Sequence, residues 1–296
     1  MTTIKSHSVG NGDMFYIDHS SDNFTIIDCC LNDDDDDTIL DEIAELDANS
    51  GIARFISTHP DEDHLRGLAR LDDRINILNF YCVKNDATKE DESDSFIRYC
   101  KLRDSTKAFY IEKDCSRRWM NQSSDARSSS GITILWPDRD NEHFKEALED
   151  ANAGGSPNNI SAVIQYMRKG MKRAVALWMG DLETDFMTNI ESALNLSKVC
   201  LLFAPHHGRA SGKVPATMLE KLSPQIVIIG EAPSEHLDYY EGFDTITQNS
   251  AGDLVFECHD DEIDIFSSLD YEVDFLLDKG RSLAGHYYVG TLRSLA

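Results

Sequence analysis

The feature that most constrains the fold is a series of short apolar runs separated by helical patterns. The runs are rich in β-branched side chains, and their lengths are typical of buried strands. They are Met14–Ile17, Phe24–Ile27, Ala53–Ile56, Ile75–Tyr81, Ile132–Trp136, Ala162–Met167, Ala174–Met179, Val199–Ala204 and Ile226–Ile229. Helical spacing of apolar residues predicts helices at Thr38–Leu46, Phe144–Leu148, Thr184–Leu194 and Ala216–Leu222. Alternating strands and helices predict a layered α/β protein.

Two segments lie outside this alternation. Residues 84–130 are polar, charged and serine-rich, which predicts an insertion or a mobile lid. A further strand is predicted at Ile263–Phe266, and residues 267–296 continue beyond it as a helical or strand appendix. We therefore expect one domain over residues 1–266, followed by a C-terminal appendix.

The chain is strongly acidic, with 28 Lys and Arg against 53 Asp and Glu and a formal net charge of -25. Such a charge repels polyphosphates over the whole surface, and its acidic faces could bind a protein partner. Arg98–Arg127 and Arg168–Arg173 are locally basic, so a basic groove on an acidic body is still possible. No run approaches the ~20 apolar residues of a membrane span, and the first residues lack the apolar stretch of a signal peptide. We expect no membrane segment and a cytoplasmic location.

The strongest functional signal is Thr58-His59-Pro60-Asp61-Glu62-Asp63-His64, directly after a predicted strand. Two imidazoles and three carboxylates at a strand exit are costly to bury unless metal ions or hydrogen bonds compensate them. A strand end aims alternate side chains at one point, so His59 and Asp61 can share one ion, and the following turn brings Asp63 and His64 to a second. The pattern predicts a two-metal site; the alternative is an exposed acidic turn with two incidental histidines.

Two later strand ends carry the same residue types. One apolar run is followed by Gly180-Asp181, where the glycine permits a close turn beside the carboxylate. The next is followed, after a proline, by the paired His206 and His207. Three strands thus deliver His and Asp at their carboxyl ends, where α/β sheets generally place their sites.

The order of these elements resembles the metallo-β-lactamase superfamily, and specifically its ComEC-like branch, named for the hydrolase domain of a bacterial competence DNA-uptake protein. The residues that match its metal motifs are His59, Asp61, Asp63, His64, Gly180-Asp181 and Pro205-His206-His207-Gly208. Segments similar to its other motifs are Val9-Gly10-Asn11-Gly12-Asp13, Ile26-Ile27-Asp28, Ile134–Pro137, Asn158–Val163, Pro224–Gly230 and Ser250–Asp253. The resemblance implies an αβ/βα four-layer sandwich and hydrolase chemistry, without the uptake protein's membrane channel.

The resemblance also implies two divalent ions bridged by Asp181. The first would be held by His59, Asp61 and Asp181, and the second by Asp63, His64, Asp181 and His206 or His207. The familiar lactamases carry His where this chain has Asp61, and an oxygen-rich ligand set suits manganese better than a nitrogen-rich one. Manganese is therefore the favoured metal and zinc the runner-up.

The implied chemistry is attack of a metal-bound hydroxide on phosphorus, for which two ions lower the pKa of water and neutralise the leaving oxygen. We expect Asp63, Asp181 and His207 to act directly in catalysis, with Asp63 orienting or deprotonating the water. The resemblance implies a phosphodiesterase, and specifically a nuclease acting on DNA. The alternatives are a phosphodiesterase for small molecules such as cyclic nucleotides, and a hydrolase subunit that is active only with a protein partner.

Several other residues are candidates for supporting roles. Asp28 is a candidate to hold a ligand histidine in the required tautomer, or else a strand-end cap. Asn158 and Asn159 would bind substrate oxygen or a metal, or form an ordinary turn. His236 would complete the site or lie in an exposed loop.

Three residues that follow the paired histidines are candidates to bind phosphate. Arg209, Ser211 and Lys213 could donate charge-assisted hydrogen bonds to a phosphoryl group. Basic residues after a strand are also common features of a protein surface, which is the alternative.

Overall fold

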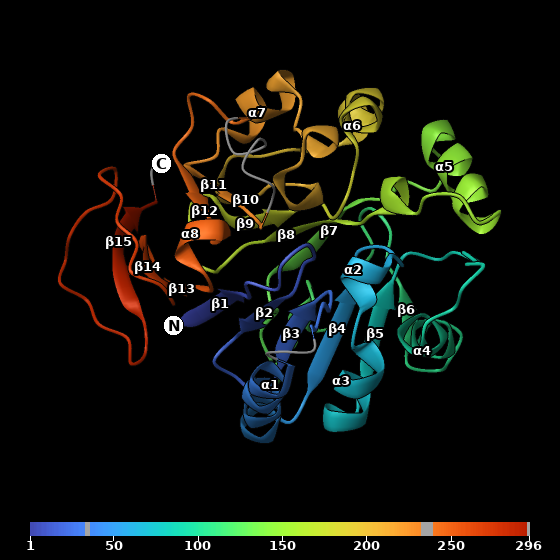
Figure 1. The fold of residues 1–296 in the computed structure, drawn as a ribbon, viewed down its shortest axis with the longest axis horizontal. Coiled ribbons are helices and arrows are strands. Elements are labelled where there is room, and N and C mark those ends of the chain that lie inside the picture. The colour runs from blue at the N-terminus through green and yellow to red at the C-terminus, as the bar shows by residue number, and fades with distance from the viewer. Residues whose placement is uncertain (33–35, 232–238, 295–296) are drawn as a thin grey trace.

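The computed structural model describes residues 1–32, 36–231 and 239–294, which form two β-sheets packed face to face (Figure 1). The strands of the larger sheet are, from edge to edge, β15 (Tyr287–Arg293), β14 (Glu262–Ser267), β13 (Leu254–Cys258), β1 (Thr2–Ser6), β2 (Phe15–Asp18), β3 (Phe24–Ile27), β4 (Ala53–Ser57), β5 (Asn79–Cys82) and β6 (Ala108–Tyr110). Those of the smaller sheet are β12 (Thr245–Thr247), β11 (Ile226–Ile229), β10 (Val199–Phe203), β9 (Ala174–Trp178), β8 (Val163–Tyr166) and β7 (Ile132–Trp136).

Helices cover the outer faces of both sheets (Figure 1). On the larger sheet these are α1 (Asp36–Ser50), α3 (Leu68–Ile75) and α4 (Asp94–Arg103), and on the smaller sheet α6 (Thr184–Ile190) and α7 (Ala216–Leu222). The remaining helices are α2 (Glu62–Leu65), α5 (Glu142–Asn152), α8 (Gln248–Ala251) and the 3-10 turns η1 (Asn158–Ile160), η2 (Glu191–Ala193), η3 (His206–Gly208) and η4 (Ala210–Gly212). The order helix, sheet, sheet, helix confirms the predicted α/β sandwich.

The main core lies between the sheets and fixes how their ends meet. Phe15 of β2 packs edge-on against Phe203 of β10 with ring centroids 4.9 Å apart, and Phe203 stacks on Trp178 of β9 at 5.0 Å. All three rings are buried. Truncating one such ring to Ala typically costs about 3–5 kcal/mol, because the cavity cannot fully collapse. This packing fixes the ends of β9 and β10 beside the larger sheet.

Both sheets contain a parallel half, and this determines where their loops converge. The strands β3 to β6 are parallel in the larger sheet, as are β9 to β12 in the smaller one. Their carboxyl ends therefore lie together at one edge of each sheet, the position that gives α/β proteins their sites.

The apolar run Ile75–Tyr81 was expected to be one strand, and that prediction is wrong. Leu68, Leu71 and Ile75 have helical spacing and form the buried face of α3, so Ile75 ends a helix. The strand β5 begins only at Asn79.

The two segments that the sequence set apart also contribute to the larger sheet. Residues 84–130 contain α4 and β6, and β6 pairs with β5. Residues 267–296 contain β15, which pairs with β14 at the opposite edge. Across the described ranges, no helix is both long enough and apolar enough to cross a membrane.

Candidate metal centre

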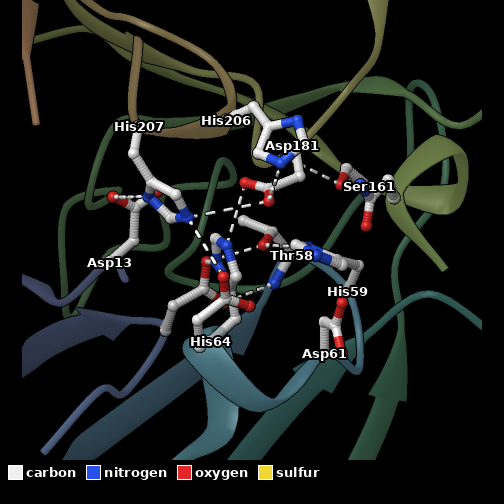
Figure 2. A network of polar contacts seen from close by, with 12 residues as sticks. Asp13, Thr58, His59, Asp61, His64, Ser161, Asp181, His206 and His207 are labelled. Carbon is white, nitrogen blue, oxygen red and sulfur yellow. Dashed lines mark hydrogen bonds and ion pairs between the residues drawn. The ribbon is translucent and has the colours of Figure 1, made fainter. Parts of the chain in front are cut away.

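The candidate site lies where strands of the two sheets end side by side (Figure 2). The strand ends supply Asp28 after β3, His59 after β4, Asp63 and His64 in α2, Asp181 after β9, and His206 and His207 after β10. The loop before β2 adds Asp13. Residues separated by up to 194 positions in the chain are therefore in direct contact.

Glycine at position 180 is required by a close approach of two loops. Its backbone φ is +52°, and a Cβ there would lie 2.7 Å from Oγ of Ser161 and 3.0 Å from Cβ of Thr58. The same Ser161 hydroxyl accepts a hydrogen bond from the backbone N–H of Asp181 at 3.0 Å. A side chain at position 180 would displace this contact, which positions Asp181.

The paired histidines sit in a strained turn. His206 and His207 both adopt left-handed φ values, 53° and 57°, which non-glycine residues rarely do. The backbone N–H of His206 donates to the carbonyl of Gly180 at 3.0 Å, so the turn is tied to the loop that carries Asp181. Strain of this kind persists where the surroundings impose it, and here it holds both rings near one carboxylate.

His64 is buried and is held between two carboxylates. Its Nδ1 lies 2.8 Å from Oδ2 of Asp28 and its Nε2 lies 2.9 Å from Oδ1 of Asp181. Asp28 also accepts hydrogen bonds from the backbone N–H and the hydroxyl of Thr58 at 2.7 and 2.6 Å. Asp28 is fixed by these donors, so its contact keeps a proton on Nδ1 and leaves Nε2 to face the site.

His207 repeats this arrangement from the other sheet. Its Nδ1 lies 3.1 Å from Oδ1 of Asp13, and its Nε2 lies 3.3 Å from Oδ2 of Asp63 and 3.7 Å from Oδ2 of Asp181. His206 approaches the same Asp181 oxygen with its Nε2 at 3.6 Å. Asp181 is thus the carboxylate that His64, His206 and His207 share.

These contacts strongly perturb the titration of the site. Burial alone would lower the pKa of His64, but Asp181 and Asp28 outweigh it and hold the pKa well above the ordinary value. In the same way, burial is outweighed at His207, where Asp13 and Asp181 raise the pKa to about 10. Burial would raise the pKa of Asp181, but His64 and His207 hold it well below its usual range. Without a metal, both imidazoles therefore carry protons that neutralise the buried carboxylates.

The residues fit a metal ion in three respects. Nε2 of His59 is buried and has no hydrogen-bond partner among the described residues, whereas the buried Nε2 of His64 and Oδ1 of Asp181 face each other at 2.9 Å. One ligand atom each from Asp13, His64, Asp181 and His207 lies within 4.8 Å of the others. Ligands about 2.1 Å from one ion stand up to ~4.2 Å apart, so a small contraction would close this cage.

His59 and Asp61 lie beside this cage. The His59 ring centroid is 4.2 Å from that of His64, and its Nδ1 lies 3.1 Å from the Thr58 hydroxyl. Asp61 lies at the edge of the group in Figure 2, where its Oδ1 accepts from Lys89 Nζ at 2.6 Å and from the backbone of Glu62 at 2.8 Å. Asp61 is therefore the N-cap of α2, and Lys89 would compete with a metal for this oxygen.

The asparagine pair is divided between two environments. The Asn159 side chain exchanges two hydrogen bonds with Glu183, donating to its carboxylate at 2.9 Å and accepting from its backbone N–H at 3.1 Å. Asn158 is buried, and its Oδ1 has no partner among the described residues. Asn159 thus stabilises the loop after β9, and Asn158 keeps an unused oxygen.

The three phosphate-binding candidates after β10 also have partners in the chain. Ser211 lies 3.0 Å from Nδ1 of His206 and so orients that ring. Arg209 donates to the Asn11 side chain, and Lys213 places its Nζ 6.0 Å from the centre of the Tyr239 ring. His236 lies outside the described residues.

Sequence reasoning assigned no role to Asp13. Gly12, directly before it, comes so close to α2 that a Cβ would lie 2.6 Å from the Asp63 carbonyl oxygen. The Asp13 N–H donates to that same oxygen at 3.1 Å, which places its carboxylate beside His207. The sequence held one usable signal, since Gly12-Asp13 repeats the Gly180-Asp181 pair.

The two-sheet sandwich is similar to the fold of a solved metallo hydrolase, and its strand ends carry a His and Asp cluster that could hold a metal ion. Among solved structures, the chain is similar to Igni18, a metallo hydrolase from the hyperthermophilic archaeon Ignicoccus hospitalis, with 14% sequence identity and a TM-score of 0.51. The likeness covers 87% of this chain and 100% of that chain. No family model matches the sequence. No curated protein matches it either.

Proposed function

We propose that this protein is a metal-dependent hydrolase of phosphodiesters. The observation that carries the proposal is the convergence of the buried His59, His64 and Asp181 from both sheets, where Nε2 of His59 has no hydrogen-bond partner among the described residues. Buried polar atoms of this kind are costly, and a divalent cation would satisfy all three. Igni18 supports the fold, and the ComEC-like motifs support the chemistry.

One ion would be held by His64, His207 and Asp181 with Asp63 beside them, and His59 offers a ligand toward a second. Bound divalent ions supply Lewis-acid polarisation of a phosphoryl oxygen and neutralise charge on the leaving group. Asp28 and Asp13 hold the two imidazoles in position. Asp63 is only half-buried, so its carboxylate can orient a water molecule and accept its proton. Manganese remains our proposed metal, with zinc as the alternative.

The ComEC-like motifs imply DNA as the substrate class. The leading specific activity is therefore that of a nuclease. Non-specific nucleic-acid binding requires Lys and Arg to neutralise phosphates. Arg209 and Lys213 lie in the segment that follows His207 and could supply part of that charge. A basic protein partner could supply the rest to this acidic chain.

A small phosphodiester is the second candidate, and the placement of the arginines favours it. Arg98 is paired with Asp72 and Asp73 at 2.6 and 2.8 Å, and Arg103 is paired with Asp104 at 2.8 Å. These guanidinium groups are neutralised within the chain, so they are not free to form a basic groove for nucleic acid. A small substrate needs no such groove.

The test combines metal analysis with hydrolysis. Asp63→Asn and His64→Gln preserve side-chain size, and we expect both variants to keep their circular dichroism while losing metal content and hydrolysis of bis-nitrophenyl phosphate. Asp41→Asn on the exposed face of α1 is the matched control. Full metal content in His64→Gln would refute the site. Turnover of the small ester with intact DNA would reject the nuclease and retain the small phosphodiester.

A further inference from the structure

A cavity lined by several arginines lies at the end of the larger sheet away from the metal centre. Its volume is ≈500 Å³, and it is lined by Asn23, Ile52, Arg54, Leu78, Asn79, Tyr81, Ser116, Arg117, Arg118, Trp119 and Arg127. Arg54 and Asn79 stand at the amino ends of β4 and β5, whereas His59 follows the carboxyl end of β4. Arg54 and His59 are thus roughly 16 Å apart along an extended strand. The two sites are separate.

The charge of this cavity is opposite to that of the chain. Four arginines line it, and none of its described lining residues is Asp or Glu. The whole chain has a formal net charge of -25, so a wall of arginines without carboxylates is unexpected. Elsewhere in the chain, Arg98 and Arg103 are paired with acids. Of the four, Arg127 is paired with Asp22, and the cavity therefore still concentrates positive charge at Arg54, Arg117 and Arg118.

Arg54 is the strongest indication of an anion site. Its side chain is 95% buried, yet its hydrogen bonds go to neutral oxygens, the hydroxyls of Thr25 at 2.9 Å and Ser130 at 3.4 Å. Its Nε has no partner among the described residues. A buried charge without a counter-charge is strongly unfavourable. An anion in the cavity would remove that cost.

The other arginines are arranged around aromatic rings. Arg117 donates from Nε to the Tyr81 hydroxyl at 3.0 Å and lies 4.5 Å from the Phe109 ring centre. Arg127 lies 4.4 Å from the Trp119 ring centre, and it also pairs with Asp22 outside the lining. Arg118 is exposed at the cavity. Guanidinium planes and aromatic faces together offer stacking surfaces next to N–H groups that can donate hydrogen bonds to an anion.

We propose that this cavity binds a phosphorylated small molecule with a flat ring, of the nucleoside monophosphate class. The phosphate would be bound by Arg54, Arg117 and Arg118, because guanidinium groups match phosphate oxygens bidentately. The ring would lie against the half-buried Trp119. A volume of ≈500 Å³ is within the range of small-molecule sites. This proposal is independent of the hydrolase activity.

The position of Trp119 allows binding to be followed directly. Trp136 and Trp178 are buried in the core, so Trp119 is the half-buried tryptophan that a ligand in the cavity would cover. We expect adenosine monophosphate to change the fluorescence and to protect it from iodide quenching. Adenosine should do neither, and inorganic phosphate should bind more weakly than the nucleotide. Trp119→Phe should lose the signal while calorimetry still detects binding.

Variants separate this site from general charge effects. Arg117→Gln and Arg118→Gln should each weaken nucleotide binding about tenfold, the size of one charge-assisted hydrogen bond. Arg139→Gln removes the same charge from an exposed residue paired with Glu112, and it should leave binding unchanged. Both cavity variants alter partly exposed side chains, so the fold should survive. Equal binding of adenosine and its monophosphate, or unchanged binding in both cavity variants, would overturn the proposal.

Discussion

Oδ2 of Asp28 lies 2.8 Å from Nδ1 of His64, and Oδ1 of Asp13 stands in the same relation to Nδ1 of His207 at 3.1 Å. The first pair joins two loops of the larger sheet, whereas the second joins the larger sheet to the smaller one. In both, the carboxylate holds one ring nitrogen so that the other faces Asp181. The centre is thus built from two carboxylate–histidine pairs around one shared aspartate.

Asp28→Asn should weaken metal binding without unfolding the protein. The amide has one acceptor oxygen in place of two and carries no charge. It therefore cannot accept from Nδ1 of His64 and from both Thr58 donors, and the ring loses its tautomer preference. Such partners of ligand histidines are typically worth 10–100-fold in affinity. Competition with a chromogenic chelator measures the change, and unaltered affinity would show that Asp28 is only a strand-end cap. Asp41→Asn should bind metal normally.

Gly180→Ala should damage the site through the backbone. The added Cβ meets Ser161 at 2.7 Å in a left-handed conformation, so the loop that carries Asp181 must move. Strain and overpacking of this kind cost about 1–3 kcal/mol each. Urea unfolding should therefore show a lower midpoint, accompanied by reduced metal content. Gly51→Ala is the control, because it also has a positive φ but no atom within 4 Å of the new Cβ.

Metal binding should release protons even in mildly alkaline solution. Carboxylates raise the pKa of His207 to about 10 against the effect of burial, but a ligand imidazole must be neutral. Because the folded pKa exceeds the ordinary 6.5, this group stabilises the metal-free protein fully below pH 6.5 and progressively less as pH rises to about 10. At pH 8, an indicator dye should detect the release of at least about one proton for each metal ion that binds. No proton release would contradict the carboxylate contacts.

Acid should destabilise the protein partly through His19, far from the metal centre. Burial lowers its pKa to about 3, and Arg54 adds to the effect. A depressed folded pKa means that stability is fully present above pH 6.5 and declines as pH falls toward 3. His19→Gln should make the fall in the free energy of unfolding shallower by at most about 1.4 kcal/mol per pH unit. The change should be smaller than this limit, because the His19 ring is only half-buried and solvent screens its charge. The exposed His143→Gln should leave the slope of urea-derived stability against pH unchanged.

Local patterns in the sequence predicted most of what is local in the structure. The runs at Ile132–Trp136 and Ile226–Ile229 form strands over those same residues, and Ala216–Leu222 forms a helix. Period and length suffice for such segments, because burial on one or both faces selects the residue types. The strand-end position of His59 and Asp181 was readable for the same reason.

Contacts between distant segments were decided only by the tertiary structure. The strand β1 pairs with β13 more than 240 residues later, and neither segment records its partner in its own composition. Likewise, Asp13 looks like an ordinary turn residue until packing of the two sheets brings it to His207. Arg54 looks like a strand residue until the fold buries its guanidinium group beside the hydroxyls of Thr25 and Ser130. Hydrophobic periodicity determines which face of an element is buried, whereas the choice of neighbour depends on how all the elements pack at once.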